Sequence, residues 1–444
     1  MPVLPSGLVI AAVLIEILLF GLTRLTGKSS AVPAVILTLI SAHIVYLMTV
    51  YWAYLRRQNT LPTLFIIGVA LIFRVTVWPL TGPVTDDLYR YRWEAQVQSL
   101  GGNPYSSRPI DPEWASLRDS TWPQVGQKDV PAGYGPAWEA ISWLTYRFAS
   151  AITSDPHRQA FWFKLPAALF DLCTIALLWI WLRKRSLPLD RILVYAWCPL
   201  PVWEFWANGH NDAPVLCFLV GALLLADGRR WVLASASLGA AVALKFWPVL
   251  LIPAFTIRSR RWYFPVIAGL VFVFCALPYA TDVQWNARYM SGFVGGWRNN
   301  DSIFGLLLAV TADQYQAKYL AFGLIFAFAL WFATRPWRLE KIVLWTIVSL
   351  LLLSSNCHPW YLTWFLPLLV FESVGPLLLW SALMPLTYSV WIEWKLLGQW
   401  NGSGPLRWFV YIPFFLYLLW WIWDSRKQVL VQNNLSFPPA GDAR

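Results

Sequence analysis

Residues 232–257, VLASASLGAAVALKFWPVLLIPAFTI, form an apolar run that is long enough to cross the core of a bilayer. Basic residues nevertheless flank both ends of this run, with Arg230 before it and Arg258 after it. Because Lys and Arg collect in cytoplasmic loops, both ends are expected to face the cytoplasm. Lys245 and Pro248 lie in the middle, where two half-helices can meet around a cavity. We therefore expect a re-entrant pair of half-helices here, in preference to a full span.

The rest of the chain has the composition of a polytopic membrane protein. Hydrophobic residues make up 58% of the 444 residues and charged residues 13%, and several apolar blocks approach the roughly 20 residues that a membrane helix needs. The first block, residues 7–22, has no basic residue before it, which favours a first span over a cleaved signal peptide. We predict an all-α integral membrane bundle of about 12 spans plus the re-entrant pair. One transmembrane domain covers residues 1–427, and residues 428–444 form a disordered cytoplasmic tail.

The formal net charge of +11 is distributed in short clusters at the ends of apolar runs, which indicates topology and argues against nucleic-acid binding. The positive-inside rule places these clusters, and both termini, in the cytoplasm. The clusters are Arg56–Arg57, Arg183–Arg191, Arg229–Arg230, Arg335–Lys341 and Arg426–Lys427. Residues 81–136 instead hold seven acidic and five basic residues, which predicts a large extracytoplasmic loop over 81–157. Its last part, residues 136–152, is weakly amphipathic and is expected to lie along the membrane surface.

Four polar stretches then fall on the outer side: TDDLYRYRWEAQVQSLGGNPY (85–105), NGHNDAP (208–214), GGWRNNDS (295–302) and SSNCHPWY (354–361). Three of them also have a purely structural interpretation. Asn211 or Asp212 before Pro214 is a good helix start, and Asp301 with Ser302 suits a helix cap. The stretch His358–Tyr361 suits a helix boundary with interfacial aromatic residues. The sequence leaves both interpretations open.

The first stretch and Lys245 are harder to explain as structure alone. Adjacent Asp86 and Asp87 place two like charges beside lipid, where repulsion and desolvation both act against them. A cation, the nearby Arg90 and Arg92, or a role as catalytic base would account for the pair. A lysine at membrane depth calls for an anionic partner, either a ligand or a structural carboxylate. Four histidines without i, i+4 spacing make a zinc enzyme improbable, although paired acids could hold a divalent metal.

The motifs follow one another along the chain as Asp86–Glu94 (DDLYRYRWE), Gly102–Tyr105 (GNPY), Gly209–Asp212, Lys245 before Pro248, Arg298–Ser302 and Pro359–Tyr361. In this order they resemble bacterial GT-C glycosyltransferases that use polyprenyl-phosphate sugars, especially the mannosyltransferase-like group. That group reads D-D-x-x-R-Y-x-W-D-G followed by G-x-N-P-Y. Glu94-Ala95 departs from its Asp-Gly, and Tyr134-Gly135-Pro136 departs from its frequent Tyr-Pro-Pro.

The resemblance implies a GT-C-like catalytic domain in the inner membrane with an extracytoplasmic active site. It implies inverting transfer of a hexose, with mannose favoured, from a polyprenyl-phosphate donor to a glycan or glycolipid acceptor. Such a transfer needs a carboxylate base, for which Asp86 and Asp87 are candidates, and cationic groups for the departing phosphate. We assign that phosphate to Lys245, Arg298 and His358. The predicted substrate-binding residues are Arg90, Tyr91, Trp93, Asn103, Tyr105, His210, Asn211, Asp212, Asn300, Asp301, Trp360 and Tyr361.

No cofactor is required by this chemistry, although a divalent metal remains compatible with it. A lipid or solute carrier is the competing class, because broken helices around a membrane-depth charge also form transport sites. The concentration of polar groups on one side, with the carboxylate pair in a long loop, favours the enzyme. A structural subunit without activity of its own is a third interpretation that the sequence allows.

Overall fold

The computed structural model describes residues 5–24, 31–55, 61–82, 84–282, 297–402 and 404–435. Within these ranges the regular structure is helical, and the sole extended pairing is an isolated bridge between Asn299 and Asn356. The all-helical prediction is therefore confirmed. Arg56 and Arg57 lie outside the described residues. The last helix continues to Leu435, and the remainder of the predicted disordered tail also lies outside them.

The main helices have the following bounds: α1 Ser6–Thr23, α2 Ala31–Leu55, α3 Thr63–Val77, α4 Asp87–Ser99, α5 Pro136–Ile152, α6 Pro156–Trp162, α7 Lys164–Lys184, α8 Leu193–Ala196, α9 Pro199–Pro201, α10 Asp212–Asp227, α11 Trp231–Leu244, α12 Ile252–Ser259, α13 Tyr263–Ala276, α15 Ile303–Thr311, α16 Gln314–Ala333, α17 Leu339–Leu353, α18 Gly375–Leu383, α19 Val390–Leu397 and α20 Arg407–Leu435. Short 3-10 or π segments join several of them. Those used below are η4 Val202–Ala207, η5 Trp247–Leu251, η6 Leu277–Asp282, η7 Pro359–Trp364 and η8 Leu366–Val370.

Six helical segments in the described ranges are long and apolar enough to cross a membrane. They are Ser6–Thr23, Ala31–Leu55, Pro156–Lys184, Tyr263–Ala280, Gln314–Ala333 and Gly375–Leu397. Helix α1 shows why: Leu8, Ile15 and Leu19 are fully buried, yet Ile10 and Ile17 on its other face are more than half exposed. A helix that is apolar on all sides belongs in lipid. The protein is thus a membrane protein, and the expected total of about 12 spans remains a prediction.

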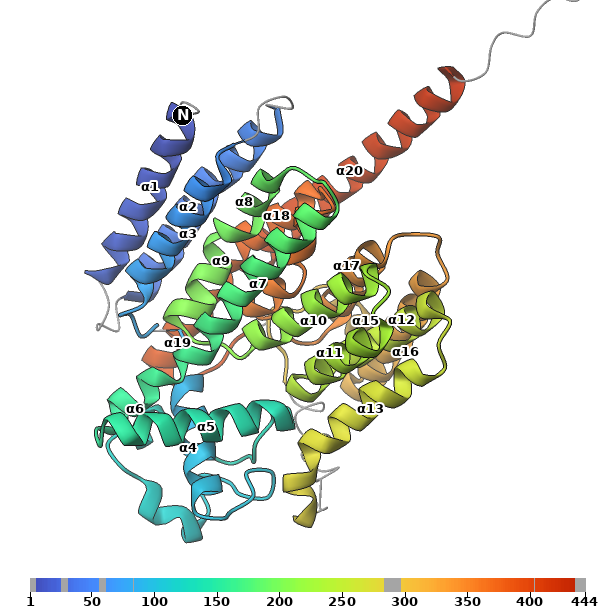
Figure 1. Cartoon of the computed structure of the whole chain (residues 1–444). Helices are drawn as coiled ribbons and strands as arrows, with labels where there is room; N and C mark the ends of the chain where they lie inside the picture. Colours follow the sequence, from blue (N-terminus) through green and yellow to red (C-terminus); the bar gives the residue numbers. More distant parts are fainter. Residues whose placement is uncertain are drawn as a thin grey trace, which may run out of the picture.

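Helices α4, α5 and α6 lie together at one end of the molecule, and the N-terminus of α1 lies at the other (Figure 1). Helix α5 covers the residues for which a surface helix is predicted. Helix α7 follows α6 and leads away from this end over 21 residues, which corresponds to about 30 Å. The two ends of α7 are therefore separated by roughly the thickness of a bilayer core.

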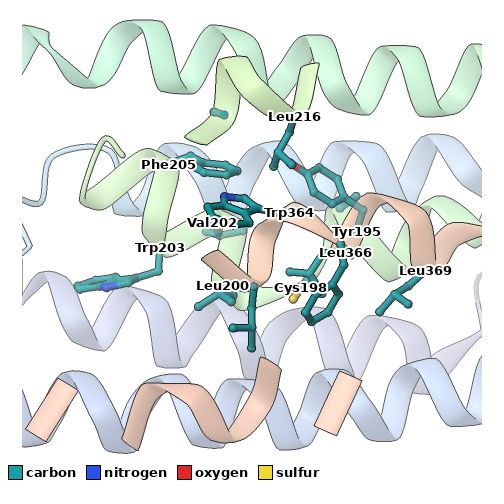
Figure 2. Packing of buried hydrophobic residues seen from close by; sticks show 14 of the residues in the cluster. Tyr195, Cys198, Leu200, Val202, Trp203, Phe205, Leu216, Trp364, Leu366 and Leu369 are labelled. Atoms are coloured by element: carbon teal, nitrogen blue, oxygen red, sulfur yellow. The ribbon is translucent and has the colours of Figure 1, made fainter. Parts of the chain in front are cut away.

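The core between the long helices contains Trp203 and Phe205 of η4, Leu216 of α10 and Trp364 of η7 (Figure 2). A polar centre is also buried here. Arg74 Nε lies 2.6 Å from Asp171 Oδ2, and Tyr195 and Trp206 donate further hydrogen bonds to the same carboxylate. Since these donors replace the water that Asp171 loses, the ion pair is tolerated in the apolar core.

The apolar run 232–257 is broken at its middle, as predicted. Helix α11 ends at Leu244, Lys245 has extended backbone, and the chain continues through η5 into α12. Trp231 at the start of α11 and Arg258 near the end of α12 line one cavity. The first and last residues of this segment therefore lie close together, and Lys245 is midway between them in sequence. Its re-entrant relation to a membrane stays a prediction.

Candidate active site

Asp87 is the first residue of α4, and side chains from three segments surround its carboxylate. Tyr91, one helical turn further on, donates its hydroxyl to Asp87 Oδ2 at 3.2 Å, and Tyr134 donates to Oδ1 at 3.1 Å. His210 Nε2 lies 3.6 Å from Oδ2. The Asp87 side chain remains 20% exposed, so a substrate hydroxyl can reach it.

Asp86 precedes α4, and its carboxylate faces Gly126 in the segment 81–136, which is called the outer loop after its predicted side. A Cβ added at Gly126 would lie 2.1 Å from Asp86 Oδ2, so this approach needs glycine. Burial, together with the charge of Asp87, raises the pKa of Asp86 to about 7, against the opposing effect of Arg90 and Lys128. A carboxylate with a pKa near neutrality can accept a proton from a hydroxyl at neutral pH.

Lys245, the lysine predicted to lie at membrane depth, has a carboxylate partner. Lys245 Nζ lies 2.6 Å from Asp212 Oδ1, and Trp364 Nε1 donates to the same oxygen at 2.5 Å. The ammonium group also lies over the rings of Tyr361 and Trp364, at 4.8 and 5.3 Å. Asp212 is fully buried, whereas the Lys245 side chain is 22% exposed. Because an ammonium group has three donors, Lys245 can bind a further anion while it stays paired.

Gly135 brings the outer loop onto the end of α11. A Cβ at this position would lie 2.2 Å from the carbonyl oxygen of Ala243. Gly135 thus packs against the turn that precedes Lys245. Its neighbour in sequence, Tyr134, hydrogen bonds to Asp87. The same loop therefore contacts both Asp87 and the turn before Lys245. The departure from Tyr-Pro-Pro therefore has a structural reason, since a larger residue would push the loop away.

His210 joins the carboxylate of α4 to the core of the bundle. Its Nδ1 lies 2.8 Å from Glu204 Oε2, and Glu204 also accepts hydrogen bonds from Asn208 Nδ2, at 2.9 Å, and from the Tyr388 hydroxyl. Burial lowers the pKa of His210, but the hydrogen bond and charge of Glu204, with the charges of Asp87 and Asp212, outweigh it and raise the pKa overall. His210 is thereby held with Nε2 toward Asp87.

We expect Glu204→Gln to lower the pKa of His210, because an amide keeps a hydrogen-bonding group but removes the carboxylate charge. Histidine-selective isotope labelling and NMR titration of the purified protein measure this shift directly. The resonance of His157 on α6 serves as the internal control. An unchanged His210 titration in a folded Glu204→Gln protein would contradict the assigned role of Glu204.

Aromatic stacking connects His210 to the stretch at 354–361. The rings of His210 and Trp360 stack with centroids 4.1 Å apart, and His358 stacks on Trp360 at 4.4 Å. Burial, with the nearby charges of His210 and Lys245, lowers the pKa of His358 to about 3. His358 is therefore neutral at neutral pH, and it can offer a phosphate a hydrogen bond but no positive charge.

Residues 298–301 border the site without contacting Asp87. Asp301 is fully buried and pairs with Arg298 at 2.8 Å and with Arg407 at 2.7 Å. Asn300 donates to the carbonyl oxygen of Cys357, and Asn299 Nδ2 lies 3.0 Å from His358 Nδ1. This segment thus fixes the stretch that carries His358 and Trp360. Arg298, with a side chain 28% exposed, pairs with Asp301 and precedes Asn299, which contacts His358.

The two capping interpretations are replaced by ion pairs. Asn211 and Ser302 occupy the N-cap positions of α10 and α15, but neither side chain makes a capping hydrogen bond. Asp212 instead pairs with Lys245, and Asp301 with two arginines. The buried Nδ2 of Asn211 has no acceptor among the described residues, so it is a donor that a substrate could use.

Several residues assigned to substrate binding support the outer loop. Arg90 pairs with Glu94 at 2.7 Å and donates to the backbone carbonyls of Gln127 and Val130. Trp93 is buried against Val97 and Val125. The structure therefore does not bring Arg90 and Trp93 together with Asp87.

Asn103 and Tyr105 connect the outer loop to the segment after α13. Asn103 Nδ2 donates to the carbonyl oxygen of Tyr279 at 3.1 Å, and the rings of Tyr105 and Tyr279 lie 5.3 Å apart. The Tyr105 hydroxyl donates to the carbonyl oxygen of Tyr134 at 2.9 Å. These residues act on the site through the position of Tyr134.

Glu94, the departure from the Asp of the family motif, meets Glu139 of α5. Both side chains are fully buried, and each keeps one carboxyl oxygen without a hydrogen-bond partner among the described residues. Burial raises the pKa of each, and for Glu139 the charge of Glu94 adds to the effect. Arg90, whose Nε lies 2.7 Å from Glu94 Oε1, is the counterion of this buried pair.

Three residues at the site were missed from the sequence: Glu204, Tyr134 and Trp364. Glu204 carries a usable signal, because a lone acid in the apolar stretch 192–207 is costly and by default functional. Tyr134 also carries a signal, because it begins the Tyr-Gly-Pro counterpart of the family's Tyr-Pro-Pro, whereas Trp364 resembles an ordinary aromatic residue of a membrane protein and only the fold identifies it. Among the described residues, no three His, Cys, Asp or Glu side chains converge as metal ligands.

Comparison with protein families assigns the chain to the membrane glycosyltransferases, and more narrowly to the mannosyltransferases. Residues 7–260, more than half of the chain, match the family described as "Alpha-(1->6)-mannopyranosyltransferase, N-terminal domain". The chain belongs to this MptA_B family. The match spans the motifs from Asp86 to Lys245 and confirms the resemblance to GT-C mannosyltransferases. No curated protein and no solved structure gives a significant match.

Proposed function

We propose that the protein transfers mannose from a polyprenyl-phosphate donor to a hydroxyl of an extracytoplasmic glycan or glycolipid, with inversion at the anomeric carbon. The observation that carries the proposal is the carboxylate pair at the start of α4. Burial and the charge of Asp87 raise the pKa of Asp86 to about 7, and the carboxylate of Asp87 lies 3.6 Å from His210 Nε2. The mannosyltransferase family match supports the sugar.

The reaction can be written with these residues. The hydroxyl oxygen of the acceptor bonds to the anomeric carbon of the donor sugar, and Asp86 accepts the proton that this hydroxyl loses. The bond from that carbon to the phosphate oxygen breaks, and polyprenyl phosphate leaves with the electron pair. Lys245 stabilises the departing phosphate, with His358 and the Asn211 amide as neutral donors. Asp87 is fixed by hydrogen bonds from Tyr91 and Tyr134. Its carboxylate oxygens can accept further hydrogen bonds from sugar hydroxyls and so orient the sugar.

The donor class is tested with the full chain in proteoliposomes. Polyprenyl-phosphate mannose is expected to support transfer to added glycolipid, and a nucleotide-activated mannose is not. Transfer would be followed by mass spectrometry of the product lipids. Use of the nucleotide donor with no transfer from the lipid donor would contradict the donor assignment and leave the family assignment intact.

We further propose that α4, α5 and α6 face the outside and that α11, η5 and α12 form the re-entrant pair. The common position of Trp231 and Arg258 at one cavity supports this arrangement, as do the basic residues around it. The whole bundle would then contain about 12 spans, with both termini in the cytoplasm.

Sidedness is measured with a membrane-impermeant maleimide on intact cells. Ser116→Cys, exposed in the outer loop, should be labelled, whereas Thr334→Cys and Arg261→Cys, both exposed near the cavity, should be labelled only after permeabilisation. The wild-type protein controls for the five native cysteines. Labelling of Arg261→Cys in intact cells would show a full span at Lys245, and the reverse pattern at Ser116 and Thr334 would place the site inside.

A further inference from the structure

A cavity of about 530 Å³ lies at the end of α10 opposite the candidate active site. Asp212, which pairs with Lys245, begins α10, and Asp227, which lines the cavity, ends it. The 16 residues between these ends correspond to about 24 Å. The cavity is therefore separate from the site of transfer, and residues from α10, α11, α12, the start of α17 and the segment after α7 line it.

The acidic groups of the cavity are already neutralised. Arg185 Nη2 lies 2.7 Å from Asp227 Oδ1, and its Nη1 pairs closely with Glu340 Oε1. Lys184 Nζ adds a contact to Asp227 at 3.2 Å. Two carboxylates thus share two cations, so they do not repel an entering anion.

Two further guanidinium groups line the same cavity and add two positive charges. Arg258 Nη2 donates to the backbone carbonyls of Arg335 and Trp337, which uses part of its five donors and fixes its position. Arg338 is exposed at the cavity. With Asp227 and Glu340 neutralised, the net charge of the lining favours an anion.

The wall beside these cations is aromatic and aliphatic. Trp231 and Trp337 line the cavity together with Leu187, Leu223 and Leu339. Tryptophan favours the boundary between headgroups and acyl chains, and basic pockets between membrane helices recognise anionic headgroups. Free phosphate would use the guanidinium groups but would gain nothing from the tryptophan and leucine side chains.

We propose that this cavity binds the phosphodiester headgroup of an anionic membrane phospholipid, with Arg258 and Arg338 on the phosphate and Trp231, Trp337 and Leu187 against the glycerol and upper acyl chains. This site lies at the opposite end of α10 from the proposed donor site. The bound lipid is structural or regulatory, and it is not consumed in the reaction.

The test uses the purified full chain and native mass spectrometry with lipids of matched acyl chains. Phosphatidylglycerol is expected to remain bound and phosphatidylcholine to dissociate, while soluble glycerol phosphate in millimolar excess fails to displace the bound lipid. Arg338→Gln should weaken phosphatidylglycerol retention about fivefold, the scale expected for one basic residue at a lipid headgroup. Because Arg338 is exposed, this variant is expected to fold.

Arg426→Gln is the matched control, since it removes one exposed positive charge from α20 without touching the cavity. Three outcomes would overturn the proposal: equal retention of both lipids, equal weakening by Arg338→Gln and Arg426→Gln, or displacement by glycerol phosphate, which would indicate a soluble-anion site. A second variant, Arg258→Gln, is expected to act in the same direction as Arg338→Gln.

Discussion

Asp86→Asn is expected to lower kcat for mannosyl transfer by about 100-fold or more, the scale on which enzymes lose rate without their general base. Asparagine has nearly the same shape as aspartate, so packing against Gly126 is kept while the proton acceptor is lost. The measurement is the initial rate in proteoliposomes at saturating polyprenyl-phosphate mannose. Donor affinity should be nearly unchanged, since the phosphate is held elsewhere.

The pH profile of the same variant gives an independent readout. The pKa of Asp86 is raised to about 7, so the unprotonated base accumulates, and the wild-type rate rises, as pH increases through that value. Asp86→Asn should lose this limb, and Asp111→Asn, an exposed-loop control that pairs with Arg108, should retain it. A wild-type rate and profile in Asp86→Asn, with the loss seen in Asp87→Asn, would transfer the role of base to Asp87.

Lys245→Ala is expected to have two separate effects. It leaves the fully buried Asp212 without its cation, which should cost about 3 kcal/mol in the free energy of unfolding. It also removes a charged hydrogen bond to the donor phosphate, which should weaken donor binding about tenfold or more. Thermal unfolding and binding of polyprenyl phosphate, the proposed leaving group, measure the two effects separately.

The double variant Lys245→Ala with Asp212→Asn separates the structural role of the lysine from its role in binding. Neutralising Asp212 should restore much of the stability, because no unpaired charge stays buried. Affinity for polyprenyl phosphate should remain low. Lys128→Ala, which removes a lysine of the outer loop, is the control. If the double variant recovers both stability and affinity, Lys245 serves only as the partner of Asp212.

Features set by local sequence could be predicted. The helix at 136–152 follows from its amphipathic pattern, and the break at Lys245 follows from a charge and a proline within an apolar run. The predicted association of Asp87, His210, Lys245 and Trp360 also agrees with the structure, which connects Asp87, His210 and Trp360 through direct contacts and Lys245 through Tyr361.

Assignments within the first motif required knowledge of helical geometry. The motif of residues 86–94 predicts one functional unit. On α4, however, successive side chains are rotated by about 100° around the helix axis. Asp87 and Tyr91 share one face and meet at the site, whereas Arg90 and Glu94 share another and hold the outer loop. Trp93 packs with Val97 on a third face. The contribution of Glu204 and Trp364 depends on long-range packing that no local pattern reports.

The buried pair of Glu94 and Glu139 couples folding to protonation. The formal net charge of +11 counts both glutamates as ionised, whereas burial favours the neutral form of each. Both pKa values lie above those of the unfolded chain, so the folded protein binds protons more tightly at these two positions, and this contribution to stability is lost as pH rises through the raised values. Docking of α4 on α5 is therefore coupled to proton uptake, and the acidity of the medium becomes one of the conditions that hold the two helices together.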